Sequence, residues 1–191
     1  MKSGGVVVYP TDTAYGMAVD ATNTAAVEKL YRVKGRDFKK PVHVIPPSQQ
    51  AIGQFAKVSQ TAKKLMRVFM PGPITLVLPL KSAAKNWKKL SAGTKTIGVR
   101  IPDHTLALQL VKALGKPITT TSANVSSQPN CYSVPEVTKQ FANQAYKPDF
   151  YLDGGKLRKL KPSTVVLLTE EHAKIIRPGP IKETEIKRAL K

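Results

Sequence analysis

The sequence predicts an α/β domain built around a twisted, mixed β-sheet. Short β-favouring runs and amphipathic helical segments are mingled along the 191 residues without the strict strand–helix alternation of a doubly wound parallel sheet. The apolar share of 41% is ordinary for a chain that buries a core. We see no repeat, low-complexity tract or linker, so we expect one domain over residues 1–191.

Runs of β-branched and other apolar residues mark the expected strands. The first, Val6–Tyr9, is bounded by Gly4-Gly5 and by Pro10, and Ile74–Leu78 follows the rigid turn Pro71-Gly72-Pro73. In chain order the expected strands are Val6–Tyr9, Val42–Ile45, Ile74–Leu78, Thr96–Ile101, Ile118–Thr121, Phe150–Asp153, Thr164–Leu168 and Ile175–Arg177.

Apolar residues at helical spacing mark the expected helices. In Thr24–Arg32, for example, Val27, Leu30 and Tyr31 share one face, and Thr24 is the expected N-cap. In chain order the expected helices are Thr24–Arg32, Ser48–Phe55, Ser59–Phe69, Leu106–Leu114, Glu136–Ala142 and Glu183–Leu190. The basic stretch Lys81–Lys95, which carries Trp87, has no clear pattern and is expected to be irregular.

The charge is strongly basic. Lys and Arg number 31 against 12 Asp and Glu, which gives a net charge of +19. Such an excess favours polyanionic partners such as RNA or nucleotides. The alternative is a generally basic, well-solvated surface, because the lysines are spread through the whole chain. The single cysteine, Cys131, permits no internal disulfide and suits a cytoplasmic location. No apolar run approaches the ~18–20 residues of a membrane span, so no membrane association is expected.

Several familiar catalytic patterns are missing from the sequence. There is no P-loop, dinucleotide fingerprint or nucleophile elbow. The histidines His43, His104 and His172 lack metal-ligand spacing and are expected to be structural, so no protein metal site is predicted. Scarce acidic residues argue against a hydrolase that uses a carboxylate pair.

The strand Ile118–Thr121 runs into small hydroxyl and amide side chains that continue to Ser127. Such side chains compete with the backbone for hydrogen bonds, so a regular helix or strand gains little from them. They suit a strand-end loop that grips an oxygen-rich ligand, and an ordinary capped turn is the alternative.

Cationic residues form a second set of candidates. Lys34, Arg36 and Lys40 cluster after a helix, with Gly35 allowing close approach, and suit a triphosphate. Arg100 and Arg177 end strands, where each could bind a carboxylate or phosphate or form a surface ion pair. Neutral donors and acceptors come from Thr11, Thr13, Thr120, Ser122, Asn124 and Ser163. Without an evident nucleophile, this set favours phosphoryl or adenylyl chemistry through positioning and charge neutralisation, with Mg²⁺ held mostly by the nucleotide.

Seven segments in order give the chain a resemblance to a known family. They are Pro10–Gly16, Lys34-Gly35-Arg36 with Lys40-Pro41, Pro71–Thr75, Val99–His104, Thr121–Ser126, Ser163–Val166 and Ile176–Gly179. Together they resemble the YrdC-like threonylcarbamoyl-AMP synthases in their short, single-domain form. Two departures are Asp37, where the family usually has Pro, and Ser127, where Gly is more common.

The resemblance implies a YrdC-like sheet with a large basic concave cavity. It also implies a reaction in which L-threonine, bicarbonate or CO₂, and ATP with Mg²⁺ give L-threonylcarbamoyl-adenylate and pyrophosphate. A partner transferase would then move the threonylcarbamoyl group to tRNA.

The resemblance also assigns roles to residues. The catalytic tetrad would be Lys34, Arg36, Ser122 and Asn124. These four and Lys40, Thr96 and Arg177 would bind ATP, and Thr13, Arg100, Thr120 and Ser163 would bind threonine, with Arg100 on its carboxylate.

Two other interpretations remain open at this point. A non-catalytic module could use the same basic cavity to bind double-stranded RNA or tRNA, with an affinity that falls with salt. Carbamoyl-adenylate chemistry within a hydrogenase-maturation enzyme would need further domains.

Overall fold

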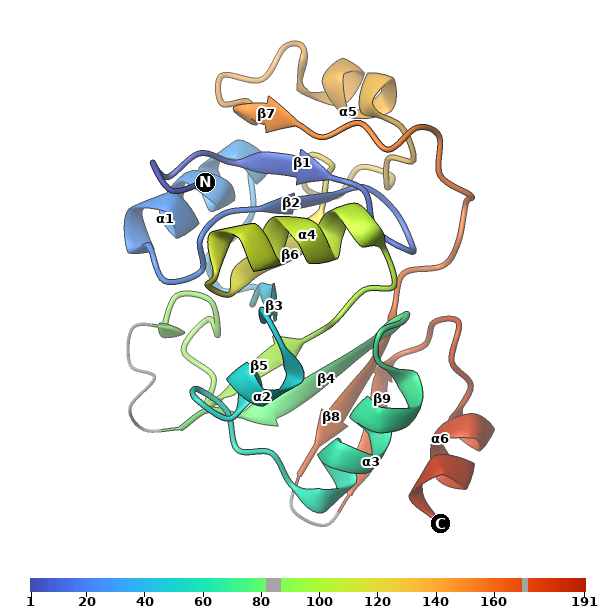
Figure 1. Ribbon diagram of the computed structural model, residues 1–191. Helices are drawn as coiled ribbons and strands as arrows, with labels where there is room; N and C mark the ends of the chain where they lie inside the picture. The colour runs from blue at the N-terminus through green and yellow to red at the C-terminus, as the bar shows by residue number, and fades with distance from the viewer. Residues whose placement is uncertain (82–86, 170–171) are drawn as a thin grey trace.

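The computed structural model describes residues 1–81, 87–169 and 172–191, and within them nine strands form one mixed sheet (Figure 1). The strands are β1 (Val7–Tyr9), β2 (Gly16–Ala18), β3 (His43–Ile45), β4 (Ile74–Pro79), β5 (Thr96–Val99), β6 (Ile118–Ser122), β7 (Phe150–Tyr151), β8 (Thr164–Leu168) and β9 (Ala173–Arg177). Their order is β7-β1-β2-β6-β3-β5-β4-β8-β9. The expected mixed α/β sheet is confirmed.

Neighbouring strands pair in both directions. The pairs β1–β7, β3–β5 and β4–β8 are parallel, whereas the other neighbours are antiparallel. Short links join the antiparallel pairs β1–β2 and β8–β9, whereas β2–β6, β3–β6 and all three parallel pairs bring together strands that are far apart in the chain. Strand β6 lies between β2 and β3 and joins the two halves of the sheet.

Six helices lie within the described ranges. They are α1 (Thr24–Lys34), α2 (Gln49–Ile52), α3 (Gln60–Phe69), α4 (Thr105–Leu114), α5 (Val134–Phe141) and α6 (Glu183–Leu190). The side chains of Ser48, Ser59 and Ser133 each accept a hydrogen bond from a backbone N–H of the first turn that follows. None of the described helices is long and apolar enough to cross a membrane.

Two details of the expected elements were wrong. Asn23, rather than Thr24, caps α1, because its side chain accepts a hydrogen bond from the backbone N–H of Ala26. Strand β2 was missed, since Gly16, Met17 and Ala18 carry little β-propensity and are held by pairing with β1 and β6. Of the irregular stretch expected over Lys81–Lys95, residues 82–86 lie outside the described ranges, while Trp87 is buried and packs on Phe55.

The core has two parts, and the smaller one positions the functional site. Beneath α4, the side chains of Ala107 and Val111 pack on Tyr9, Ile45 and Ile118. The larger cluster joins buried residues of α1, α3, α5 and α6 with the rest of the sheet. Helix α4 thus covers only one end of the face formed by β6 and β3.

A prediction concerns Gly179, which lies against the backbone that follows Pro162. A Cβ atom at position 179 would lie 2.5 Å from the carbonyl oxygen of Pro162. Because backbone cannot rotate away, we expect Gly179→Ala to lower the free energy of unfolding by about 1–3 kcal/mol in urea denaturation.

The matched control is Gly53→Ala. Gly53 has helical dihedrals, φ −60° and ψ −15°, and an added Cβ would meet only the carbonyl oxygen of Gln50 at 3.4 Å. Its stability should stay within about 0.5 kcal/mol of wild type. Equal midpoints for both variants would contradict the close packing at Gly179.

Candidate active site

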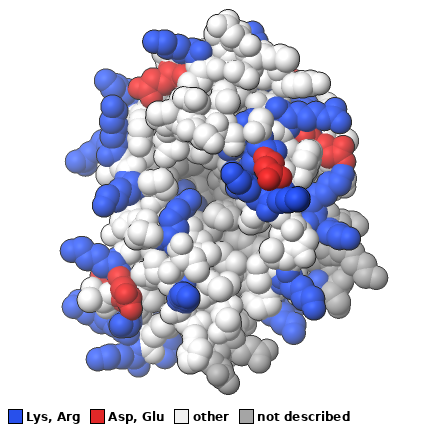
Figure 2. Space-filling view, turned by 180° about the vertical axis from the view of Figure 1, so that it is seen from behind, with Lys and Arg blue, Asp and Glu red and all other residues white. Residues whose placement is uncertain are grey.

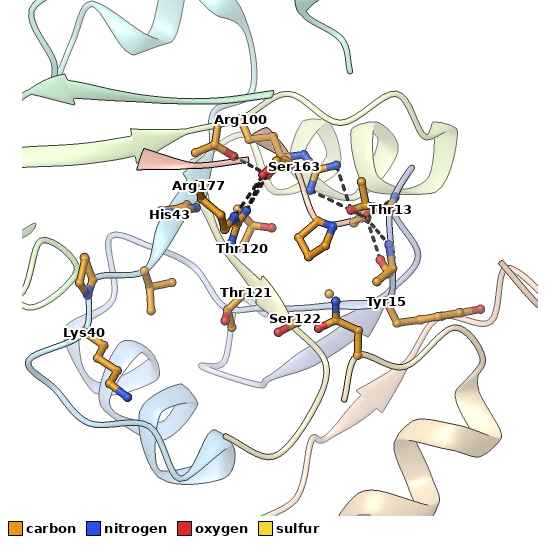
Figure 3. A pocket seen from close by; sticks show the side chains of 18 of the residues that line it. Thr13, Tyr15, Lys40, His43, Arg100, Thr120, Thr121, Ser122, Ser163 and Arg177 are labelled. Atoms are coloured by element: carbon orange, nitrogen blue, oxygen red, sulfur yellow. Dashed lines mark hydrogen bonds between the residues drawn. The ribbon is translucent and has the colours of Figure 1, made fainter. Parts of the chain in front are cut away.

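A cavity of about 390 Å³ opens where β6 and β3 continue beyond α4 (Figure 3). His43 pairs with Thr120 two residues beyond the Ile45–Ile118 pair, which lies under α4. Alternate residues of a strand share a face, so Thr120 and His43 extend the face that the two isoleucines begin. The cavity is lined by Thr11, Thr13, Ala14, Tyr15, Gly16, Arg36, Lys40, Pro41, Val42, His43, Thr75, Arg100, Thr120, Thr121, Ser122, Asn130, Pro162, Ser163 and Arg177.

Eight of the eleven site residues proposed from the sequence line this cavity. They are the cations Arg36, Lys40, Arg100 and Arg177 and the hydroxyl residues Thr13, Thr120, Ser122 and Ser163. They come from strand ends and loops that are far apart in the chain. The remaining three, Lys34, Asn124 and Thr96, lie outside the lining.

Lys34 is buried behind the cavity wall. Its ammonium donates hydrogen bonds to the carbonyl oxygen of Ser122 at 2.6 Å, the Oδ1 of Asn124 at 2.6 Å and the carbonyl oxygen of Asn124 at 3.0 Å. Burial, together with the charge of Arg36, lowers the pKa of Lys34 to about 7. Three acceptor oxygens nevertheless match the three donors of the protonated form. Lys34 therefore ties the end of α1 to the turn after β6.

Gly35 separates Lys34 from Arg36. It ends α1 in the left-handed region, with φ 59°, and its N–H bonds back to the last turn of the helix. Beyond this turn, Arg36 donates from Nε to the carbonyl oxygen of Lys40 at 3.3 Å and from Nη2 to that of Pro41 at 2.8 Å. Lys34 is thus buried in the core, whereas Arg36, two residues later, lines the cavity.

Arg100 is held deep in the cavity by the segment after β1. It forms an ion pair with Asp12, and both terminal nitrogens donate to the hydroxyl of Thr13 at 3.1 Å. Burial lowers the pKa of Arg100, and the carboxylate of Asp12 opposes that shift. Within the described ranges, neither Nε of Arg100 nor Oδ2 of Asp12 has a hydrogen-bond partner, although both atoms are buried.

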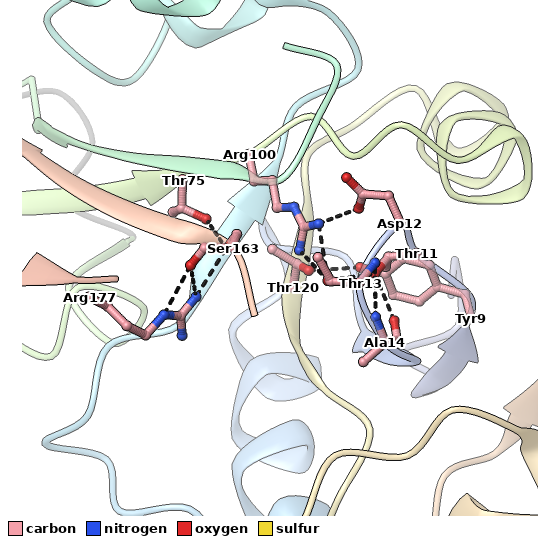
Figure 4. A network of polar contacts seen from close by, with 10 residues as sticks. All are labelled: Tyr9, Thr11, Asp12, Thr13, Ala14, Thr75, Arg100, Thr120, Ser163 and Arg177. Carbon is pink, nitrogen blue, oxygen red and sulfur yellow. Dashed lines mark hydrogen bonds and ion pairs between the residues drawn. The ribbon is translucent and has the colours of Figure 1, made fainter. Parts of the chain in front are cut away.

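Ser163 and Arg177 form a second anchored pair. Arg177 donates from Nε and Nη2 to the carbonyl oxygen of Ser163 and from Nη2 to its hydroxyl at 3.0 Å. The hydroxyl of Ser163 also lies 2.8 Å from that of Thr75. Figure 4 shows this pair beside the Arg100 network, so two guanidinium groups approach the cavity from β5 and β9.

Thr96 lies away from this network. It is the first residue of β5, whereas Arg100 follows the last residue of that strand. Its hydroxyl lies 3.2 Å from that of Thr94. The nucleotide role that the resemblance gives Thr96 remains a prediction.

His43 also lines the cavity, a position that the sequence does not indicate. Its ring packs over Gly98, where a Cβ would collide with it. Burial and the nearby charges of Arg177, Arg36 and Arg100 lower the pKa of His43 to about 3. The imidazole is therefore neutral at pH 7. The sequence does not mark His43 as a cavity residue, because a single histidine in a short strand has no distinct pattern. Its position at the cavity follows only from its pairing on β3 with Thr120.

The side-chain chemistry of the lining is cationic and hydroxylic. None of the lining residues is a carboxylate, and the described part of the chain contains no group of three His, Cys, Asp or Glu side chains that could hold a metal ion. Figure 2 shows Lys and Arg side chains spread over one face, with few acidic ones among them. Such an arrangement can bind phosphates and carboxylates.

Comparisons with known proteins point to one family. A family model for Sua5, YciO and YrdC, described as telomere recombination, matches residues 1–179. A Bacillus subtilis protein named threonylcarbamoyl-AMP synthase is 34% identical over 192 residues, covering 100% of this chain and 54% of that protein.

Two solved structures share the fold. The structure of Pyrococcus abyssi Sua5 complexed with L-threonine has a TM-score of 0.91 and 33% identity, covering 99% of this chain and 54% of that one. The structure of Escherichia coli YciO has a TM-score of 0.83 and 27% identity, covering 97% and 88%. This chain therefore spans about half the length of the Bacillus and Pyrococcus proteins.

A prediction follows from the neutral imidazole of His43. Between pH 6 and 4.5 the unfolded chain protonates this group, whose usual pKa is near 6.5, and the folded chain does not. Its contribution to stability should therefore fall as the pH falls, by at most about 1.4 kcal/mol per pH unit. We expect His43→Gln to show a shallower loss of stability over this range in urea denaturation at several pH values. A slope for His43→Gln equal to the wild-type slope would contradict the neutral imidazole.

A second prediction concerns the buried ammonium. Lys34→Met removes a donor from the carbonyl oxygens of Ser122 and Asn124 and from the Oδ1 of Asn124. We expect a loss of about 2–3 kcal/mol in the free energy of unfolding. Lys63→Met, at an exposed position of α3, should change it by less than about 0.5 kcal/mol. A Lys34→Met protein as stable as wild type would show that burying the ammonium costs as much as its hydrogen bonds contribute.

Proposed function

The chain belongs to the Sua5/YciO/YrdC family, and on that basis we propose that it synthesises L-threonylcarbamoyl-adenylate. The substrates would be L-threonine, bicarbonate or CO₂, and ATP, and the second product would be pyrophosphate. The observation that carries the proposal is the convergence of Arg36, Lys40, Arg100 and Arg177 with four hydroxyl side chains on one cavity. The Pyrococcus relative with the same fold was solved in complex with L-threonine.

Threonine would bind at the Arg100 end of the cavity. The guanidinium lines the cavity and is preorganised by Asp12 and Thr13. A carboxylate there would bind a cation that is already fixed in position. The hydroxyls of Thr13, Thr120 and Ser163 would supply the neutral contacts.

ATP would bind along the wall formed by the loop after α1 and the end of β6. Arg36 and Lys40 lie on that loop, Ser122 ends β6, and Arg177 ends β9. Lys34 and Asn124 would support this wall from behind, and Thr96 is retained as a nucleotide contact. Of the proposed tetrad, Arg36 and Ser122 would contact ATP directly, and Lys34 and Asn124 would hold the wall in place.

The reaction needs positioning more than acid–base groups. Attack of the threonine amine on CO₂ or bicarbonate gives a carbamate, with loss of a proton or of water respectively. A carbamate oxygen then attacks the α-phosphorus, the bond from that phosphorus to the bridging oxygen breaks, and pyrophosphate leaves. Arg36, Lys40 and Arg177 would neutralise charge on the phosphate oxygens. Since the lining offers no carboxylate, it does not fit a protein-held Mg²⁺, and the ion would accompany the nucleotide.

The product would pass to a partner transferase that modifies tRNA, in the cytoplasm. The alternative, a non-catalytic RNA-binding module, is not favoured, because curated relatives from archaea, bacteria and mammals are named as synthases.

The proposal predicts pyrophosphate release that requires ATP, L-threonine and bicarbonate together. Arg100→Lys should raise the KM for threonine roughly 10- to 100-fold, because lysine cannot reproduce the bidentate geometry, while the KM for ATP changes little. Arg36→Gln should instead raise the KM for ATP. The measurement is steady-state pyrophosphate release, with each substrate varied in turn.

Lys139→Gln, an exposed lysine of α5, is the control for a general loss of positive charge. It should keep both KM values. A folded wild-type protein that releases no pyrophosphate in a threonine-dependent manner would refute the proposal for this chain.

A further inference from the structure

Three hydroxyls on the cavity wall accept hydrogen bonds from fixed donors of the protein (Figure 4). Arg100 donates to Thr13, Arg177 donates to Ser163, and the phenol of Tyr9 donates to Thr120 at 2.9 Å. The two arginines themselves line the cavity, but Tyr9 does not. Tyr9 therefore acts on the cavity only through another side chain.

Tyr9 is fixed as a donor by its surroundings. Its side chain is fully buried on β1 and packs beneath α4 with Ile45 and Ile118. Its ring also lies over Gly16, where an added Cβ would come within 3.1 Å of the ring carbon Cζ. Burial raises the pKa of Tyr9 to about 12, so the phenol keeps its proton at every physiological pH.

The hydrogen bond from Tyr9 sets the polarity of Thr120. A hydroxyl has one proton, and an oxygen that already accepts from a phenol directs that proton elsewhere. Among the described residues, Tyr9 is the one side chain that shares a hydrogen bond with the Thr120 hydroxyl. Because Thr120 lines the cavity, its proton is available to a ligand there.

We propose that Tyr9 is a positioning residue that fixes the Thr120 hydroxyl as a hydrogen-bond donor toward the ligand. This part of the cavity then offers a proton to a carboxylate or hydroxyl oxygen of the substrate. The inference rests on the proposed function, since it assigns Thr120 to the amino-acid end of the site.

A purely structural role makes a different prediction. If the Tyr9 phenol only satisfied a buried hydroxyl, its loss would change stability and leave ligand affinity and its dependence on Thr120 unaltered. The two roles separate in a double-mutant cycle, because residues that act through one contact are not additive.

The experiment measures the Kd of L-threonine by calorimetry in the full chain, together with Tm and the KM and kcat of pyrophosphate release. The variants are Tyr9→Phe, Thr120→Val and the double variant. The control is Tyr132→Phe, which also removes a phenol hydrogen bond, here to the carbonyl oxygen of Leu160 outside the cavity lining.

We expect Tyr9→Phe to weaken threonine binding roughly three- to tenfold and to raise KM with little change in kcat. Thr120→Val should weaken binding at least as much, and adding Tyr9→Phe to it should weaken binding no further. Tyr132→Phe should bind as wild type does.

Unchanged threonine affinity in Tyr9→Phe, or additive losses in the double variant, would overturn the role of Tyr9 while leaving the proposed function intact. If Thr120→Val does not fold, Tyr9→Phe alone decides the matter through its Kd, because the substitution preserves the buried ring. Wild-type protein that binds no threonine would overturn the proposed function itself, and with it this inference.

Discussion

The ammonium of Lys34 connects the two segments that form one wall of the site, the end of α1 and the end of β6. It lies at the end of α1 and donates to the backbone carbonyl oxygens of Ser122 and Asn124, some 90 residues later in the chain. The backbone N–H of Ser126 donates in return to the carbonyl oxygen of Lys34 at 2.8 Å. A buried ammonium is costly unless every donor is satisfied, so this position fixes the turn around it closely. The loop that carries Arg36 and the strand end that carries Ser122 are held in place by that contact.

The cavity gathers positive charge with little compensation. Arg100 is paired with Asp12, whereas Arg36 and Arg177 are held by neutral backbone oxygens. Like charges around a small volume repel one another, and burial together with these charges lowers the pKa of His43 and keeps it neutral. The folded chain therefore carries unfavourable charge repulsion, which the triphosphate or the carboxylate of the proposed reaction would reduce on binding.

Local sequence patterns predict much of the fold and part of the site. Strands such as β8 are marked by consecutive β-branched residues, and the hydroxyl-rich strand ends indicate Thr120 and Ser163 as site residues from the sequence alone. Orientation cannot be predicted in the same way. Lys34 and Arg36 are two residues apart in one basic cluster, yet the left-handed Gly35 turns one inward and the other to the cavity. His43 depends on the β3–β6 register, which no short window of sequence encodes.

Polarity links these features to the chemistry. The cations of the lining can only donate, and Thr120 becomes a donor because its acceptor side faces Tyr9. A triphosphate, a carboxylate and a carbamate present acceptor oxygens on nearly every side, so such a wall matches all of them at once. The absence of Asp and Glu among the described lining residues is therefore important for the chemistry of the site. A carboxylate in this lining would neutralise a neighbouring arginine and repel each of the three anionic groups that the proposed reaction brings together.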